Sequence, residues 1–299
     1  MRVPRELHPL RLFSRIPAGH FTGGNPANIV GLHYDAETDE LYVAIARQKT
    51  VNVLCPTTAD STPRPVYTAQ APVQPSSVCL VRQTGTLLIA NIANDNPFGN
   101  FKLVALSRDT QQWRQQSGLQ VTVETTQFNV CVDSTLCELA NATVLLGAQF
   151  ATQLLVLKLT PTHELSVLRT LQIGEYMSVS SAVLNGSSLV ALVTEAASYN
   201  VSVNRLMEDK LEALSYLKPP AGILNCVLWA GEHLLLGEVS CVAQNMAIVE
   251  LDTSRTPLAR ASRLLSPEDR VSIGCWCADG ERVCVCDKNS NDILVYSVC

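Results

Sequence analysis

One short sequence pattern recurs six times and constrains the fold more than any other feature of the chain. Each copy is a turn signal followed by a short apolar run, as in GSS-LVAL and DGER-VCVC. The apolar runs begin at Leu41, Leu87, Val144, Leu189, Leu234 and Val283. These starts lie 46, 57, 45, 45 and 49 residues apart. A repeat of this length that is made of strands alone is typical of the blades of a β-propeller.

Each copy has apolar neighbours that extend it to a unit of four strands. One apolar run precedes it and two alternating runs follow it, and Gly, Asn, Asp and Pro separate them, which favours strands over helices. The last unit ends without a fourth run, whereas residues 10–16 (LRLFSRI) precede the first complete unit and belong to none. We therefore expect residues 10–16 to pair with the last unit, because closing the ring removes exposed sheet edges.

The predicted fold is all-β: a six-bladed β-propeller with four antiparallel strands per blade, in which the N-terminal strand closes the last blade. One domain spans residues 1–299. Its blades are expected at about residues 28–70, 76–127, 128–173, 179–217, 222–265 and 271–298, the last together with 10–16. A β-sandwich is the alternative, but it would not easily explain six four-strand units and an unpaired first run.

The stretch GCWCADGERVCVC, residues 274–286, holds four of the chain's eleven cysteines. The DG pair at 279–280 predicts a two-residue hairpin turn, in which Cys275 faces Cys284. Because side chains alternate along a strand, the four cysteines then share one face, opposite Trp276. A zinc site and a Cys275–Cys284 disulfide are both alternatives, but strand-borne C-x-C pairs splay their thiols. We expect these residues to serve as small apolar groups that pack between blades.

The overall composition excludes some classes of protein. Hydrophobic residues make up 47% of the chain and charged residues 16%, so a large core is expected and disorder is not. The formal charge of −5 makes nucleic acid an unlikely partner, because nucleic-acid binders usually carry a basic excess. The sequence has no apolar run long enough to span a membrane and no apolar signal-peptide core, so we expect a cytoplasmic or nuclear protein without membrane contact.

The stretch VCVCDKNSNDILVYS, residues 283–297, resembles the repeat signature of NHL and related YVTN-type propellers. Asp287, Asn291, Ile293 and Val295 occupy the signature positions, whereas the first unit keeps the strands and lacks the Asp. The resemblance supports a propeller of this broad superfamily and identifies no member of it. Because one fold hosts many functions, it leaves the activity open.

Some propellers of this kind are calcium-dependent lactonases or esterases, which the resemblance makes an alternative function. Calcium takes six to eight oxygen ligands. Candidate ligands in this chain are Asn25, Asn94, Asp95, Asn129, Asn225 and Asp287. The glutamate that such enzymes supply from the first blade is absent from 17–34, and no metal or other cofactor is therefore expected. RNA binding, which is known among NHL-type propellers, is a second alternative that would need a basic face.

The expected function is binding of a protein or peptide partner rather than catalysis, as a scaffold or complex subunit. No catalytic motif such as G-x-S-x-G or H-E-x-x-H occurs in the chain. In a propeller, the turns between the second and third strands and the links between blades gather on one face, and such loops often carry function. The candidate binding residues in these loops are His20, Phe21, Asn25, Arg47, Lys49, Asn94, Asp95, Phe98, Glu195, Glu238, Asp287 and Lys288.

Overall fold

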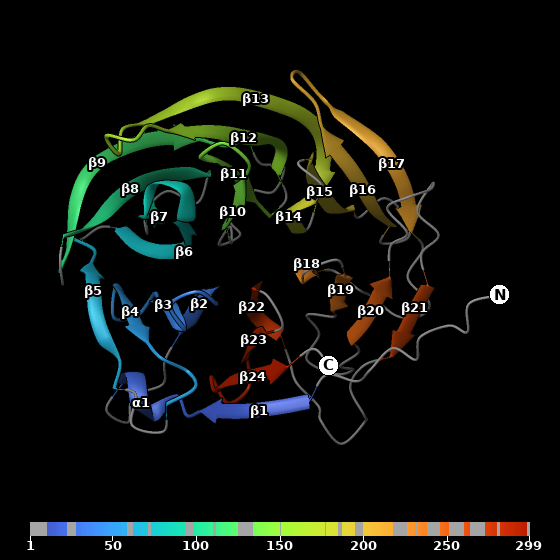
Figure 1. Cartoon of the computed structure of the whole chain (residues 1–299). Helices are drawn as coiled ribbons and strands as arrows, with labels where there is room; N and C mark the ends of the chain where they lie inside the picture. The colour runs from blue at the N-terminus through green and yellow to red at the C-terminus, as the bar shows by residue number, and fades with distance from the viewer. Residues whose placement is uncertain are drawn as a thin grey trace.

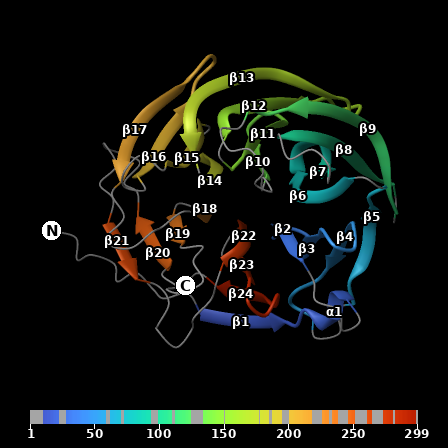
Figure 2. The same cartoon turned by 180° about the vertical axis from the view of Figure 1, so that it is seen from behind.

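The computed structural model describes residues 11–22, 28–58, 62–70, 73–93, 99–109, 112–124, 134–149, 151–176, 178–184, 187–194, 200–217, 226–230, 233–237, 246–250, 260–263, 273–279 and 282–297. In this part of the chain the strands form six four-stranded antiparallel sheets that stand around a ring (Figures 1 and 2). The arrangement is that of a β-propeller, with one strand of each sheet at the centre and one at the rim.

Five of the sheets consist of four consecutive strands each. The first contains β2 (Ile29–Asp35), β3 (Glu40–Ile45), β4 (Thr50–Leu54) and β5 (Arg64–Thr68). The second contains β6 (Val73–Val81), β7 (Thr86–Ala93), β8 (Asn100–Asp109) and β9 (Gln112–Thr122). The third contains β10 (Ser134–Leu139), β11 (Thr143–Ala148), β12 (Ala151–Leu159) and β13 (Leu165–Tyr176).

The next two sheets continue around the ring in the same way. The fourth contains β14 (Ser178–Leu184), β15 (Ser187–Thr194), β16 (Asn200–Leu206) and β17 (Leu211–Leu217). The fifth contains β18 (Cys226–Ala230), β19 (His233–Gly237), β20 (Met246–Glu250) and β21 (Arg260–Arg263).

The remaining sheet is composite, because it joins strands from both ends of the described chain. It contains β22 (Ile273–Asp279), β23 (Arg282–Asp287), β24 (Ile293–Ser297) and, at the rim, β1 (Arg11–Ile16). Arg11 lies opposite Ser297 and Ile16 opposite Ile293. Only five blades are thus contiguous in the sequence, and the pairing of β1 with β24 joins the ends of the ring (Figure 1).

Two short helical elements correct the expectation of a chain built from strands alone. Helix α1 (Gly19–Thr22) follows β1, and the 3-10 turn η1 (Arg82–Thr84) joins β6 to β7. Gly85 ends η1 with a φ of 61° and donates its backbone N–H to the Arg82 carbonyl, a left-handed conformation that glycine adopts without steric cost. Neither element was evident from apolar periodicity, because each spans at most one turn.

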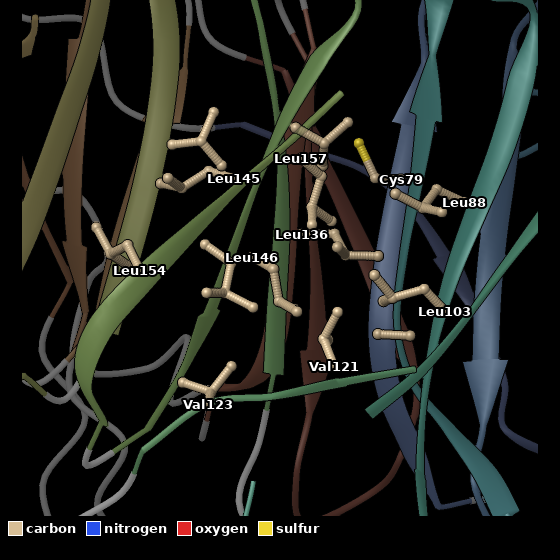
Figure 3. Close-up of a cluster of buried hydrophobic side chains, with 14 of the residues drawn as sticks. Cys79, Leu88, Leu103, Val121, Val123, Leu136, Leu145, Leu146, Leu154 and Leu157 are labelled. Carbon is tan, nitrogen blue, oxygen red and sulfur yellow. The ribbon is translucent and has the colours of Figure 1, made fainter. Parts of the chain in front are cut away.

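Buried apolar side chains fill the contacts between neighbouring sheets. In the described residues they form five clusters that follow one another around the ring. The largest cluster lies between the second, third and fourth sheets and includes Leu88, Leu103, Leu146 and Leu154 (Figure 3). Its members are almost fully buried, so the contact between blades is the hydrophobic core of the protein.

The rim strands bend at a bulge that recurs in five of the six sheets as far as the structure describes them. Along the third strand of each of these sheets, one extra residue enters the paired outer strand. The extra residues are Phe13, Val66, Gln116, Leu168 and Leu214. A bulge increases the local twist of a strand, which lets each outer strand curve around the rim (Figure 1).

The cysteine hairpin has the predicted shared face but a different register. Cys277 lies opposite Cys284, and Cys275 lies opposite Cys286, so the predicted Cys275–Cys284 pair was wrong by two positions. The strand extends to Asp279, which lies opposite Arg282, and the Asp279 carboxylate accepts a hydrogen bond at 2.7 Å from the amide of Ala36, just after β2. The cysteines whose side chains the structure describes form no disulfide, and those of the hairpin pack against the first sheet.

Candidate functional site

Three segments from opposite ends of the chain come together where the composite sheet meets the first sheet. They are residues 15–22 with α1, the 46–49 turn between β3 and β4, and the 287–292 turn between β23 and β24. The Gln48 side-chain amide donates to the Phe21 carbonyl at 3.0 Å, and the Ala18 amide donates to the Asp292 carboxylate at 3.0 Å. We call this group of three segments the basic junction.

The 46–49 turn of the basic junction is held by its backbone. The Ala46 amide donates to the Asn28 carbonyl at 2.9 Å, and the Lys49 amide donates to the Ala46 carbonyl at 3.0 Å. Lys49 has a φ of 58°, in the left-handed region that glycine and asparagine adopt far more readily than lysine. Arg47 and Lys49 therefore project from a fixed turn rather than from a pliable loop.

Both aspartates of the basic junction are occupied by contacts within it. The Asp287 side chain accepts hydrogen bonds from the Asn289 amide at 3.3 Å and from the Ser290 hydroxyl at 2.7 Å, and its residue is only 7% exposed. Asp292 accepts from the Ala18 amide and forms an ion pair with Arg15 at 3.1 Å. Asp287 was predicted to contact a partner, whereas here it shapes its own turn.

The remaining charges of the basic junction are positive. Residues 15–22, 46–49 and 287–292 contain four Arg or Lys residues and two Asp residues, in a chain whose net charge is −5. Arg47 and Lys288 are exposed, as is His20, and Lys49 is half-buried. Within the described residues, no ion pair engages Arg47, Lys49 or Lys288. The structure thus brings four predicted residues, His20, Arg47, Lys49 and Lys288, to one junction.

Phe21 corrects one part of the predicted site. It was expected at an exposed loop tip, but it is 8% exposed and packs in the cluster between the composite and first sheets. Helix α1 turns its side chain inward, and the hydrogen bond from Gln48 fixes its carbonyl. Phe21 is therefore a core residue. The other predicted residues lie outside the described part of the chain: Asn25, Asn94, Asp95, Phe98, Glu195 and Glu238.

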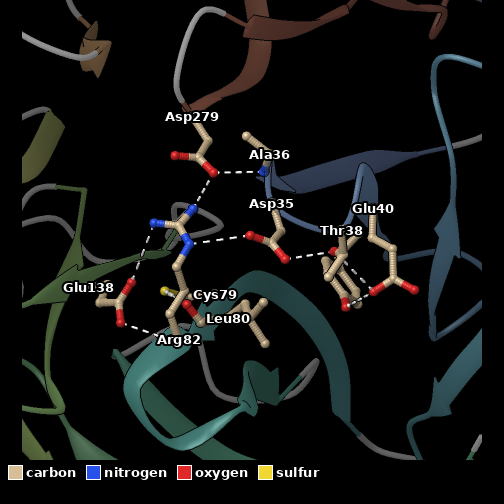
Figure 4. Close-up of polar contacts among 10 residues, drawn as sticks. Asp35, Ala36, Thr38, Glu40, Cys79, Leu80, Arg82, Glu138 and Asp279 are labelled. Atoms are coloured by element: carbon tan, nitrogen blue, oxygen red, sulfur yellow. Dashed lines mark hydrogen bonds and ion pairs between the residues drawn. The ribbon is translucent and has the colours of Figure 1, made fainter.

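A second polar cluster lies at the opposite end of the strands, where the inner hairpins of four sheets meet (Figure 4). Its centre is Arg82 in η1, which was not among the predicted site residues. The Arg82 guanidinium bonds Asp35 of the first sheet at 3.2 Å and Asp279 of the composite sheet. The Arg82 backbone amide donates to the Glu138 carboxylate of the third sheet at 2.8 Å. One arginine thus connects four neighbouring blades.

The pKa values in this cluster reflect burial and the charge of Arg82. For Asp35, burial tends to raise the pKa, but hydrogen bonds from Thr38 and Arg82 and the positive charge of Arg82 outweigh burial and lower it. Burial raises the pKa of Glu138. Burial and the nearby Arg82 lower the pKa of His33 to about 4, so its imidazole is neutral near pH 7. The cluster is therefore a stabilising ion network with Asp35 at its most buried point.

The network continues from Asp35 toward the rim. Thr38 donates to Asp35 at 2.6 Å (Figure 4). The Tyr42 hydroxyl donates to Glu40 at 2.6 Å. Arg108 pairs with Glu40 at 3.0 Å and lies over the Trp113 ring. These contacts join the first two blades from the centre to the rim. Each of the polar side chains named here has a hydrogen-bond or ion-pair partner within the network.

The described residues offer no convergent metal site. No group of three or more His, Cys, Asp or Glu side chains in this part of the chain could hold a metal ion. Of the candidate calcium ligands, Asp287 is bound within its own turn, and Asn25, Asn94, Asp95, Asn129 and Asn225 lie outside the described residues. In the same part of the chain, no helix has the length and apolar character that crossing a membrane requires.

Comparison with known proteins supports the fold without naming a family. No protein-family model matches the chain, and no curated protein matches it. Solved structures match over nearly the whole chain. Aldose sugar dehydrogenase from Streptomyces coelicolor, in its PQQ-bound form, has 8% identity and a TM-score of 0.64, with 96% of this chain and 97% of that chain covered.

Two further structures show how widely this fold is used. A chain of the mitotic checkpoint complex has 11% identity and a TM-score of 0.60, with 100% of this chain and 98% of that chain covered. Virginiamycin B lyase from Staphylococcus aureus has 10% identity and a TM-score of 0.56, with 97% and 100% covered. At these identities the likeness shows the fold alone.

These matches correct the expectation that the chain is not an enzyme. That expectation was based on the lack of a familiar catalytic motif, but a dehydrogenase and a lyase share this fold at similar TM-scores. The lack of a motif is therefore no argument against activity in this fold. The chain is a β-propeller, and the structures similar to it include both enzymes and a component of a protein assembly.

Proposed function

We propose that this β-propeller binds a partner protein through the basic junction. The observation that carries the proposal is that exposed cationic side chains from three separate segments meet there, on turns fixed by backbone hydrogen bonds. A rigid scaffold that presents charged side chains at a loop-lined edge favours specific and rapid association with a partner.

The closed ring supports this role. Apolar clusters fill the contacts between the sheets, and the Arg82 network joins four blades at the opposite end. The turns of the basic junction are therefore held before a partner arrives, which lowers the entropy that binding costs. A chain of the mitotic checkpoint complex shows that a similar fold occurs in a protein assembly.

Site-specific photocrosslinking tests the proposal directly. A photoreactive phenylalanine analogue replaces His20, which is exposed in the basic junction, and in a control protein it replaces Glu212, which is exposed on β17. After irradiation in native extract, we expect one discrete crosslinked species from position 20 and none of the same mass from position 212. Equal crosslinking from both positions, or none from position 20, would refute the proposed binding site.

A further inference from the structure

We infer that the partner segment recognised by the basic junction is acidic, with Asp or Glu side chains that engage Arg47, Lys49 and Lys288. This inference rests on the proposed function and names the chemistry of its ligand. Each of the three cations comes from a turn between the second and third strands, so all three lie at the same end of the ring. Arg47 and Lys49 belong to the first sheet and Lys288 belongs to the composite sheet.

The net charge of the junction determines which charge a ligand must carry to be attracted to it. Asp292 is paired with Arg15, whereas Asp287 accepts hydrogen bonds from uncharged donors of its own turn and keeps its negative charge. One carboxylate therefore faces three cations, and the junction stays positive. The chain as a whole has a net charge of −5, whereas the three segments of the junction together contain four Arg or Lys residues and two Asp residues. Complementary charge then favours a partner segment that carries carboxylates, and it disfavours basic segments.

The turn that carries two of the cations has an unusual conformation for its sequence. Lys49 occupies a left-handed backbone position at a φ of 58°, where Gly or Asn would be more stable. The chain therefore keeps a lysine side chain at a conformational cost, as it keeps Asp39, Ala142 and His163 in turns outside the junction. The lysine makes no ion pair with a described residue, so its charge is available to a partner.

An acidic protein segment fits the junction better than a nucleic acid or a small anion does. Single-stranded nucleic acids bind through aromatic platforms as well as charge, but the aromatic side chain of α1, Phe21, is buried in the core. A small anion requires converging donors in an enclosed site, whereas Arg47 and Lys288 are exposed and come from different turns. A segment with several spaced carboxylates can reach both turns together.

A labelled peptide measures this preference on the purified protein. The probe is a fluorescein-labelled peptide of about ten residues in which Glu and Ser alternate, and its comparison peptide alternates Lys and Ser. We expect fluorescence anisotropy to show saturable binding of the glutamate peptide alone, and a fall in affinity of about tenfold between about 50 mM and about 300 mM salt because screening weakens exposed charge pairs.

Matched charge reversals locate the binding. The variant R47E/K288E should weaken binding of the glutamate peptide by about tenfold or more, since two exposed charge pairs are each replaced by repulsion. The control R64E/K210E changes the net charge by the same amount at exposed residues outside the junction, and it should bind as the wild type does. Circular dichroism of both variants shows that each is folded.

Each outcome decides between the two claims. Peptide binding that R47E/K288E abolishes and R64E/K210E retains supports the acidic ligand. A partner that crosslinks from position 20 while the glutamate peptide fails to bind overturns the acidic ligand and leaves the proposed function standing. Tighter binding of an oligouridine RNA of about ten nucleotides than of the glutamate peptide also overturns the inference, because it would place a nucleic acid at the junction.

Discussion

Replacing Arg82 with methionine should destabilise the propeller, because Arg82 is the centre of an ion network that joins four blades. Methionine keeps much of the apolar stem and removes the charge that faces Asp35, Asp279 and Glu138. The Asp35 side chain is only 3% exposed, so its carboxylate would remain buried with no cation beside it. Asp279 and Glu138, whose side chains are 21% and 23% exposed, would be partly hydrated instead.

The magnitude follows from the geometry of the Arg82–Asp35 pair. Two charges 3.2 Å apart attract by about 5 kcal/mol at an effective dielectric constant of about 20. Removing one partner of a buried pair typically costs about 3–5 kcal/mol. Because the Arg82 side chain is 34% exposed, solvent screens part of this, and we expect the free energy of unfolding to fall by about 2–4 kcal/mol at pH 7.

The loss should shrink as the pH falls from 7 toward 4.5. In the wild type the lowered pKa of Asp35 contributes stability above the ordinary pKa of aspartate, and that contribution is lost as the pH falls through the folded-state value. In the variant, burial without Arg82 would raise the pKa of Asp35. Protonation of Asp35 at acid pH would then remove an unpaired buried charge and stabilise the folded state. His33 acts in the same direction. Its pKa is lowered by burial and partly by Arg82, so protonation of His33 at acid pH destabilises the wild type more than the variant.

Urea unfolding monitored by tryptophan fluorescence measures both effects at pH 7 and at about pH 4.5. The control is Arg114→Met, which removes an ion pair to Asp109. The two side chains of that pair are 64% and 56% exposed, so the control should change the free energy of unfolding by less than about 0.5 kcal/mol. A loss for Arg82→Met as small as that of the control would refute the argument. A loss that grows as the pH falls would refute the assignment of its cause to the carboxylates.

Three further changes follow from the structure. Tyr176→Phe should cost about 1–3 kcal/mol in urea unfolding, because the Tyr176 hydroxyl, in a residue 1% exposed, accepts the Ala148 amide at 2.9 Å and that amide would lose its partner. Leu146→Ala should cost about 2–5 kcal/mol, since its side chain is fully buried between blades; a cost under about 1 kcal/mol would contradict that packing. Lys49→Gly should raise stability by about 0.5–1 kcal/mol by relieving the left-handed backbone, while binding of the glutamate peptide weakens; a parallel change of both would contradict the trade-off.

The strands could be predicted from sequence because their signal is local. Apolar runs between turn residues mark β3 and β11 without knowledge of any other part of the chain. The pairing of β1 with β24 could also be inferred, since an unpaired run at one end matched an incomplete unit at the other. The register of the cysteine hairpin could not, because the Asp-Gly pair indicated a turn at 279–280, whereas Asp279 still pairs with Arg282.

The two polar sites also differ in whether a local sequence pattern could locate their residues. His20, Arg47 and Lys288 were predicted because they occupy turns and links between strands, which the strand pattern locates. Arg82 was missed because its partners are 47, 56 and 197 residues away, and no local pattern connects them. Phe21 was predicted to be exposed because a loop rich in glycine gives no sign that α1 turns its side chain into the core.

The composite sheet also affects how the chain emerges during synthesis. One flank of the first blade, with Leu41, Val43 and Ile45, packs against residues of β22, β23 and β24. Apart from Ile16 and Phe21, its partners in this cluster lie about 230 positions later in the chain, and making them takes on the order of 10–50 s at typical elongation rates. Throughout that interval the ring is open and the first blade exposes an apolar face. A chaperone that covers this face on the ribosome would therefore favour ring closure over aggregation.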